Sequence, residues 1–178
     1  LLHISTSSPR SSMDFNTYIY DLEAGSKVKI AKSTQPSWIN NTKIAYRKPQ
    51  SNDSGIYIYD LDTKQSEKLA GVGKSSFDPR VSQDSKTILY SDYATQKLYI
   101  YDLDAKNMTT VIDSAVDGLW INEDTFVYQK TGKCIKEDDC PMSTYTRLNL
   151  VTLNTKSNDK VELKIDNIYL VASALDSR

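Results

Sequence analysis

The sequence has few of the residues on which most catalytic and metal sites depend. Its 178 residues include one histidine, His3, and two cysteines. A serine or cysteine nucleophile needs a base within hydrogen-bond reach, and no Gly-x-Ser-x-Gly elbow occurs. No cluster of histidine and cysteine has the spacing of a zinc site. We therefore expect no catalytic residue, no metal and no cofactor. A pair of catalytic carboxylates remains the alternative, because their separation along the chain does not give their distance in the fold.

Other features are missing as well, and each absence removes a class of function. Lys and Arg number 22 against 23 Asp and Glu, so no basic surface for nucleic acid is expected. Apolar runs are only about four residues long, which excludes membrane insertion by this segment. The N-terminus lacks the charged start and apolar core of a signal peptide. The glycines at 71 and 73 lack the spacing of a phosphate-binding loop.

What the sequence does contain is one pentapeptide written three times. YIYDL stands at residues 18–22, 57–61 and 99–103, at intervals of 39 and 42 residues. A period of about forty residues is typical of stacked supersecondary units. Twelve tyrosines against three phenylalanines fit this pattern, because aromatic residues favour pleated, half-buried strands. We expect these tyrosines to serve packing.

Each unit is expected to contain four short antiparallel strands. In residues 56–61, the isoleucines point to one face and the tyrosines and Leu61 to the other. Because both faces are apolar, the strand must be covered on both sides. A polar turn and a further strand follow each copy (27–31, 66–70, 108–112), and a strand–turn–strand motif precedes it (36–46, 79–90, 118–128). Four-stranded units of this length are typical of β-propeller blades.

Asp21, Asp60 and Asp102 end the three copies of the motif. A short carboxylate at this position accepts backbone N–H bonds of the turn, so we interpret these residues as turn-capping. Calcium binding by the repeated aspartate is the alternative, but no cluster of further ligands accompanies it.

A fourth, altered unit follows, and the two ends of the chain together suggest the remaining strands of the blade that contains the first copy of the motif. Residues 147–153 take the place of YIYDL, with Thr152 in place of the capping aspartate, and residues 160–163 form the outer strand. Residues 1–5 resemble the second strand of a blade and 168–173 the first. We therefore predict one blade shared between the N- and C-termini, an arrangement that leaves no free strand edge.

The fold class is thus all-β, a propeller of about four four-stranded antiparallel blades. The predicted blades are residues 165–173 with 1–31, then 35–70, 77–112 and 117–163. The chain forms either a single propeller domain, 1–178, or a fragment of a larger propeller.

These motifs resemble those of the TolB-like β-propeller family, a relative of the WD-repeat. The family unit runs roughly P-x-W-S-P-D-G-K, then a strand, then I-Y-x-x-D-L. Residues 79–86 (PRVSQDSK) are the nearest copy, with Val81 in the tryptophan position, while Trp38 and Trp120 keep the tryptophan. The resemblance implies a propeller of six or more blades, so self-association to complete a larger ring is a further expectation. We expect both tryptophans in the core, because they repeat in phase.

One inserted loop departs from the repeat and holds both cysteines. Cys134 and Cys140 lie six positions apart in a polar excursion, which indicates a small disulfide ring outside the cytosol; two free thiols remain the alternative. A more specific alternative is metal binding by the two cysteines together with the carboxylates that lie between them. Loops that depart from a repeat commonly carry binding. The candidate partner-binding residues are Lys133, Lys136, Glu137, Asp138 and Asp139.

The sequence therefore predicts a non-catalytic interaction or scaffold domain of an exported or envelope-associated protein. It would be periplasmic, at the cell surface or secreted, and would bind a protein or glycan partner through loops on one rim. The alternative is a propeller that accompanies a hydrolase of the prolyl-oligopeptidase type in a longer protein.

Overall fold

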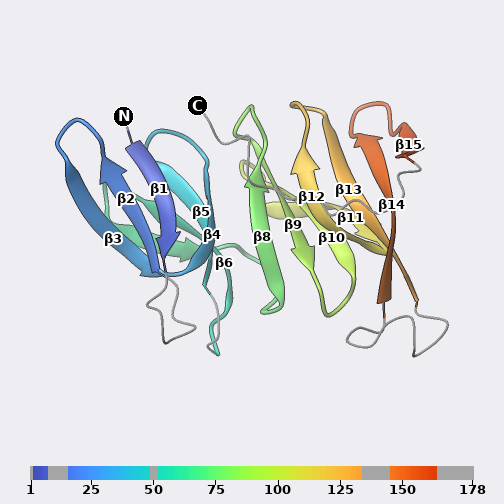
Figure 1. Ribbon diagram of the computed structural model, residues 1–178, viewed down its shortest axis with the longest axis horizontal. Helices are drawn as coiled ribbons and strands as arrows, with labels where there is room; N and C mark the ends of the chain where they lie inside the picture. The colour runs from blue at the N-terminus through green and yellow to red at the C-terminus, as the bar shows by residue number, and fades with distance from the viewer. Residues whose placement is uncertain (1, 8–15, 49–51, 134–144, 164–178) are drawn as a thin grey trace.

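The fold consists of β-strands grouped in four antiparallel sheets, as the alternating apolar pattern predicts (Figure 1). The computed structural model describes residues 2–7, 16–48, 52–133 and 145–163. The first sheet has three strands in these ranges: β1 (Leu2–Ser7), β2 (Asn16–Asp21) and β3 (Ser26–Lys32). The second sheet has four: β4 (Thr34–Trp38), β5 (Lys43–Lys48), β6 (Gly55–Asp60) and β7 (Gln65–Lys68).

The third and fourth sheets repeat this plan. The third contains β8 (Ser76–Val81), β9 (Thr87–Asp92), β10 (Lys97–Asp102) and β11 (Asn107–Asp113). The fourth contains β12 (Ala115–Trp120), β13 (Thr125–Lys133), β14 (Tyr145–Asn154) and β15 (Lys160–Leu163). Strands pair in chain order within every sheet, so neighbouring strands form a meander.

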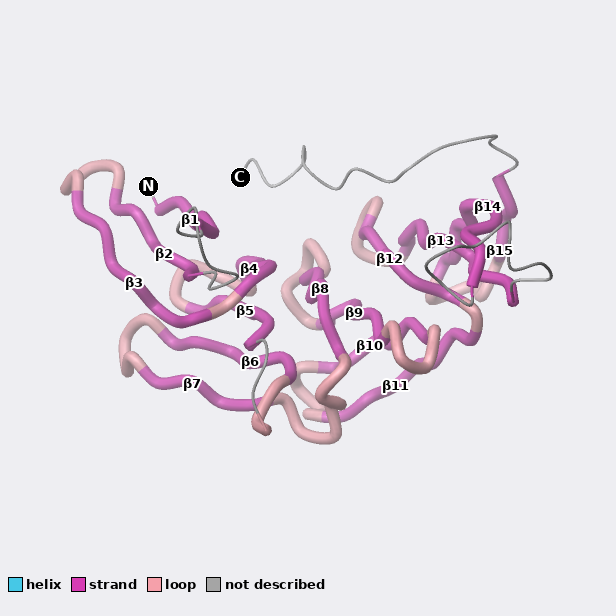
Figure 2. Tube along the Cα trace, turned by 60° about the horizontal axis from the view of Figure 1, so that its bottom comes forward, coloured by secondary structure: helices cyan, strands magenta, loops and turns pink. Residues whose placement is uncertain are grey.

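The sheets follow one another along an arc. Figure 2 shows β4, β8 and β12 on the inner side of the arc and β3, β7 and β11 on the outer side. The second, third and fourth sheets span residues 34–68, 76–113 and 115–163. β1 pairs with β2 as the second strand of a blade would. Residues 168–173, which we predict to supply the inner strand of that blade, lie outside the described part of the chain.

The tyrosine motif forms the third strand of the second and third sheets, and both of its faces are covered. Ile56 of β6 packs toward the third sheet, while Tyr57 and Tyr59 pack toward the first. A strand with two apolar faces is stable only between two layers. The alternation in the sequence therefore predicts the side-by-side packing of the sheets.

The fourth copy of the motif has a different register from the predicted one. We expected Thr152 to replace the capping aspartate, and this was wrong: Asn154 takes the place of Asp102. The Asn154 Oδ1 accepts hydrogen bonds from the backbone N–H groups of Lys156 and Ser157, both at 3.0 Å. The amide oxygen of asparagine is the same short acceptor that aspartate supplies in the other turns. Residues 151–155 therefore correspond to 99–103.

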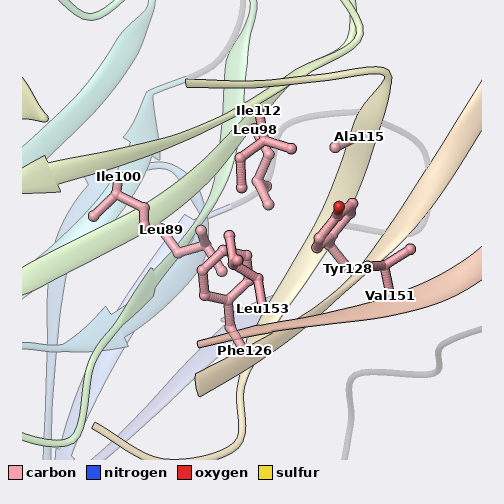
Figure 3. Close-up of a cluster of buried hydrophobic side chains, with 9 residues drawn as sticks. All are labelled: Leu89, Leu98, Ile100, Ile112, Ala115, Phe126, Tyr128, Val151 and Leu153. Carbon is pink, nitrogen blue, oxygen red and sulfur yellow. The ribbon is translucent and has the colours of Figure 1, made fainter. Parts of the chain in front are cut away.

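Apolar side chains fill the spaces between adjacent sheets. One cluster joins the third and fourth sheets and is shown in Figure 3; its members are Leu89, Leu98, Ile100, Ile112, Ala115, Phe126, Tyr128, Val151 and Leu153. Trp38 and Trp120 are only half buried, so they lie at the border of the core rather than inside it. Within the described ranges, we find no helix with the length and apolar character needed to cross a membrane.

Candidate binding site between two sheets

Tyrosines fill the spaces between the first three sheets in a repeated arrangement. Tyr46 of β5 stacks on Tyr57 of β6, with ring centroids 5.8 Å apart. In the third sheet, Tyr90 of β9 stacks on Tyr99 of β10 at 5.1 Å. A further tyrosine follows two residues later in each motif strand, Tyr59 and Tyr101, and both are buried.

The fourth sheet breaks this arrangement. Tyr128 of β13 keeps the position of Tyr90, since it faces Val151 across the strand pair as Tyr90 faces Tyr99. The next position along the motif strand holds Leu153 in place of a tyrosine. Two tyrosine rings are thus replaced by smaller aliphatic side chains between the third and fourth sheets.

The connections between sheets add to this difference. Residues 69–75 join β7 to β8, and Leu69 and Val72 from this connection pack into the core between the second and third sheets. A single residue, Ser114, joins β11 to β12. A single residue, Ser33, also joins β3 to β4, so among the described residues only the connection between the second and third sheets is long enough to add side chains to the core.

An open cavity of about 580 Å³ lies where these differences meet; we call it the inter-sheet cavity. Its walls come from β11, β13, β14, β15 and the turn before β15. The lining residues are Thr110, Val111, Ile112, Asp113, Tyr128, Lys130, Val151, Leu153, Asn158, Lys160 and Glu162. Figure 3 shows Tyr128 and Val151 side by side, with the tyrosine hydroxyl pointing away from the Phe126 end of the cluster.

The inter-sheet cavity has an apolar base and a charged rim. Ile112, Val151 and Leu153 are buried, whereas Val111 at the edge is 44% exposed. On the rim, the Lys130 Nζ lies 3.6 Å from the Glu162 Oε2. Burial, and then the negative charge of Glu162, raises the pKa of the Tyr128 hydroxyl, which therefore stays protonated. Six of the eleven lining residues are polar or charged, so the cavity is an open and mainly polar hollow between the outer strands of the two sheets.

The inner strands form a second place where polar side chains gather. Gln35, Asp78 and Asp117 occupy equivalent bulges in β4, β8 and β12, each with a positive φ of 53–55°. Such bulges redirect a side chain and are common near functional sites. The pattern of a polar residue before Pro36, Pro79 or Gly118 is the sequence signal that marks them.

The side chains at these bulges take part in hydrogen bonds and an ion pair within the protein. The Gln35 Oε1 accepts a 3.0 Å hydrogen bond from the Asp78 N–H. An Arg80 Nη2 lies 2.9 Å from the Asp78 Oδ1, and the Tyr93 hydroxyl donates a 2.6 Å bond to the Asp117 Oδ1. Burial raises the pKa of Asp78, and the Arg80 guanidinium opposes this shift. We interpret the hydrogen bonds of Gln35 and Asp117 as links between adjacent sheets.

The three repeated aspartates make the bonds expected of turn-capping residues. The Oδ1 atoms of Asp21, Asp60 and Asp102 each accept two backbone N–H bonds from the following turn, at 2.8–3.0 Å. Those backbone donors lower the pKa of Asp21 and Asp60. Among the described residues, no group of three or more His, Cys, Asp or Glu side chains is arranged to hold a metal ion.

The predicted partner-binding loop lies almost wholly outside the described residues. Lys133 ends β13, and Cys134, Lys136, Glu137, Asp138, Asp139 and Cys140 all fall in the range 134–144, which the structure does not describe. The disulfide and the binding role of this loop stay predictions. Sequence reasoning missed the inter-sheet cavity, although the loss of tyrosines between residues 147 and 155 was its signal.

Comparison with known proteins relates the chain to β-propellers. No protein-family model matches it, and no curated protein matches its sequence. TolB from Acinetobacter baumannii is 15% identical, with a TM-score of 0.61 over 89% of this chain and 39% of that one. A putative TolB from Agrobacterium tumefaciens is 12% identical, with a TM-score of 0.65 over 90% of this chain and 60% of that one.

A puromycin-hydrolyzing peptidase of Mycobacterium tuberculosis has the same architecture in part. It is 13% identical, with a TM-score of 0.65 over 90% of this chain and 26% of that one. The chain thus spans less than two thirds of each of these three structures. At such identities the likeness shows the fold alone, and that fold is a TolB-like β-propeller.

Proposed function

We propose, from the TolB-like propeller fold, that the chain is a non-catalytic interaction domain whose partner is a protein. The observation that supports this most is the inter-sheet cavity, an open hollow of about 580 Å³ with charges of both signs on its rim. The polar side chains at the bulges of the inner strands, by comparison, are already engaged, Gln35 and Asp117 in bonds between sheets and Asp78 in an ion pair with Arg80 of its own strand. Fold likeness alone does not assign an activity, so the proposal rests on the site.

A site-specific crosslinking experiment tests this function. A photo-crosslinking amino acid replaces Val111 at the edge of the inter-sheet cavity, and in a matched control it replaces Val28 on β3, which is 56% exposed. In cells of the source organism, we expect a discrete protein adduct at Val111 and not at Val28. The same adducts at both positions, or none at Val111, would contradict the proposal.

We further propose that the parent protein is exported or envelope-associated, and that the loop with Cys134 and Cys140 adds a second contact with the partner on the rim. The resemblance to TolB-like repeats and the pair of cysteines favour this location. Fractionation of cells that express the tagged parent protein tests the location. A crosslinker at Lys136 tests the loop, and recovery of the tag only in the cytosolic fraction would contradict export.

The second candidate function is a propeller that accompanies a hydrolase in a longer protein. The likeness to a peptidase of which the chain spans 26% favours it. This alternative predicts a hydrolase domain in the same reading frame, so the sequence of the parent gene distinguishes the two. Self-association to complete a larger ring is tested by the molar mass of the purified chain in solution.

A further inference from the structure

We infer that a second copy of this chain completes the first sheet. The second copy adds its residues 168–173 to the open edge of β1 and places its fourth sheet against the adjoining face. The inference goes beyond the proposed function, because it concerns the two ends of the arc and not the inter-sheet cavity. It assigns surfaces to the self-association that the sequence predicts.

The first sheet lacks the inner strand that the other three sheets have. β5, β9 and β13 each pair with a strand on both sides, whereas β1 pairs with β2 alone among the described strands. β1 is equivalent to β9, because Leu2 lies opposite Asp21 as Thr87 lies opposite Asp102. An unpaired strand edge is a template for another strand. The other sheets show which strand fits here, an antiparallel inner strand like β8.

Residues 168–173 (IYLVAS) have the apolar character of such a strand and lie outside the described ranges. Each of β3, β7 and β11 is followed by the inner strand of the next sheet, after Ser33, residues 69–75 and Ser114 respectively. After the outer strand β15, residues 164–167 form a connection of comparable length. The spacing therefore assigns 168–173 to a sheet beside the fourth.

That sheet is not the first sheet of the same chain. Figure 2 shows β1 and β15 at opposite ends of the arc, with the second and third sheets between them. Packed sheets lie about 10 Å apart, so the fourth sheet is about 30 Å from the first along the arc. A connection of four residues spans at most about 14 Å when fully extended. The blade shared between the two termini is therefore formed between two copies.

The fourth sheet has an unused hydrogen-bond acceptor where the added strand would lie. Gln129 of β13 occupies the position of Arg47 and Ser91 in the other sheets. Both of these bond to the inner strand of the following sheet: the Arg47 Nε donates a 3.3 Å bond to the Ser76 carbonyl, and the Ser91 Oγ accepts a 3.0 Å bond from the Asp117 N–H. Gln129 is 3% exposed, and its Oε1 has no hydrogen-bond partner in the described structure. A backbone N–H of a following inner strand would satisfy this atom.

The side chains around Gln129 are apolar. Val127 and Leu150 lie on the same face of the sheet as Gln129, since Tyr128 between them points to the cluster shared with the third sheet. Both are buried, although no sheet within the described ranges packs on this face. An apolar sheet face requires a covering layer. A following sheet that begins with residues 168–173 would supply it.

The first sheet presents the other half of this contact. Leu61 and Leu103, which end the second and third copies of YIYDL, pack in the clusters shared with the preceding sheet. Leu22, which ends the first copy, is instead 56% exposed. Tyr18 on the same strand is only half buried, and the Lys27 ammonium lies 3.8 Å from the centre of its ring. The fourth sheet of a second copy would cover this face as the first sheet covers Leu61.

Both halves of the contact belong to one chain, so the junction joins different surfaces of the two copies. Each copy gives its fourth sheet and residues 168–173, and receives those of the other copy at β1. Two such junctions close a dimer into a ring in which every sheet has its inner strand. The junction repeats the packing between the sheets within each chain, so it continues an interface that the fold already contains.

Light scattering of the purified full chain tests the assembly. We expect a molar mass of two chains. Leu22→Arg should raise the dissociation constant of the dimer at least about tenfold, because it places a charge in the new contact. Val28→Arg is the matched control: Val28 is also 56% exposed, but it lies opposite Ile19 on the other face of the first sheet. A molar mass of one chain, or equal effects of the two variants, overturns the inference.

Isotope mixing distinguishes a strand from a second copy from one of the same chain. A photo-crosslinking amino acid replaces Ser5 in β1, and equal amounts of ¹⁴N and ¹⁵N chains are unfolded and refolded together. Mass spectrometry should find β1 joined to residues 168–173, with about half of the joined peptides of mixed isotope composition. Joined peptides of a single isotope only would place the segment on its own chain and overturn the inference.

The parent gene provides a further check. Blade repeats encoded after residue 178 would supply the following sheet from the same chain and would overturn the second copy as its source. None of these results changes the expected Val111 crosslink, so the proposed function and this inference fail separately.

Discussion

The indole N–H of Trp120 donates a 3.0 Å hydrogen bond to the carbonyl oxygen of Arg80. The two residues belong to the inner strands of the fourth and third sheets, so the bond crosses from one sheet to the next. The Trp120 ring also meets Phe126 edge-on, at 5.2 Å between centroids. One side chain thus joins two sheets through both a polar and an apolar contact.

Trp120→Phe should weaken this junction. The variant keeps a ring beside Phe126 but removes the N–H donor, so we expect the free energy of unfolding to fall by about 1 kcal/mol. Denaturant unfolding of the purified chain measures the difference. Trp38→Phe is the matched control, because no indole bond of Trp38 is found in the described part of the chain, and it should cost less. Equal losses in the two variants would contradict the role of the Arg80 bond.

Gly118→Ala should destabilise the packing of β12 on the third sheet. A Cβ added at Gly118 would lie 2.5 Å from the Leu89 Cδ2 and 3.0 Å from the Leu98 Cδ1, and both leucines are fully buried. Overpacking of this kind costs about 1–3 kcal/mol. Gly73→Ala is the control, since its nearest contact would be 3.4 Å. Thermal unfolding should show a lower Tm for Gly118→Ala only.

Asp53 should make stability depend on pH in the acidic range. The Tyr57 hydroxyl, followed by the Lys48 ammonium 3.2 Å away, lowers the pKa of Asp53 from 3.8 to about 2. Because the folded-state pKa is depressed, the stabilisation is present above the unfolded pKa and is lost as pH falls from about 4 toward 2.

The variant Asp53→Asn isolates this contribution. At pH 7 its Tm should be lower than that of the wild type, and the difference should vanish near pH 2. Because Asp53 is exposed, 1 M NaCl should reduce the difference at pH 7 as well. A Tm difference that stays constant from pH 7 to pH 2 would argue against the ionised carboxylate as its source.

The pair Cys134 and Cys140 should be oxidised in protein exported through an oxidising compartment. The intact mass should then be lower by two hydrogens than that of the reduced chain, and alkylation should occur only after reduction. Double alkylation without reduction would show two free thiols and would remove the disulfide argument for export.

Much of the architecture follows from local sequence. The tyrosine motif predicts β2, β6 and β10 because its alternation of apolar residues has the period of a strand and its aspartate caps the turn. The hairpins before the motif can also be predicted from local sequence, because a short polar side chain caps their turns. In one of them, the Asn122 Oδ1 accepts hydrogen bonds from the backbone N–H groups of Asp124 and Thr125.

The site depends on information that local patterns do not carry. The strand around Thr152 alternates in either of two registers, and only pairing with β13 selects the one that ends at Asn154. The inter-sheet cavity lies where Val151 and Leu153 take the places of two tyrosines and meet a neighbouring sheet. Its existence is a property of two sheets together, which a single strand does not reveal.

The half-buried position of Trp120 also provides a natural spectroscopic probe. The chain has two tryptophans, so Trp38→Phe leaves a single fluorophore, and that fluorophore is in contact with Phe126. Its emission would report on the junction of the third and fourth sheets alone. Separation of this junction would shift the emission toward longer wavelength before the rest of the fold responds, which makes local opening distinguishable from global unfolding.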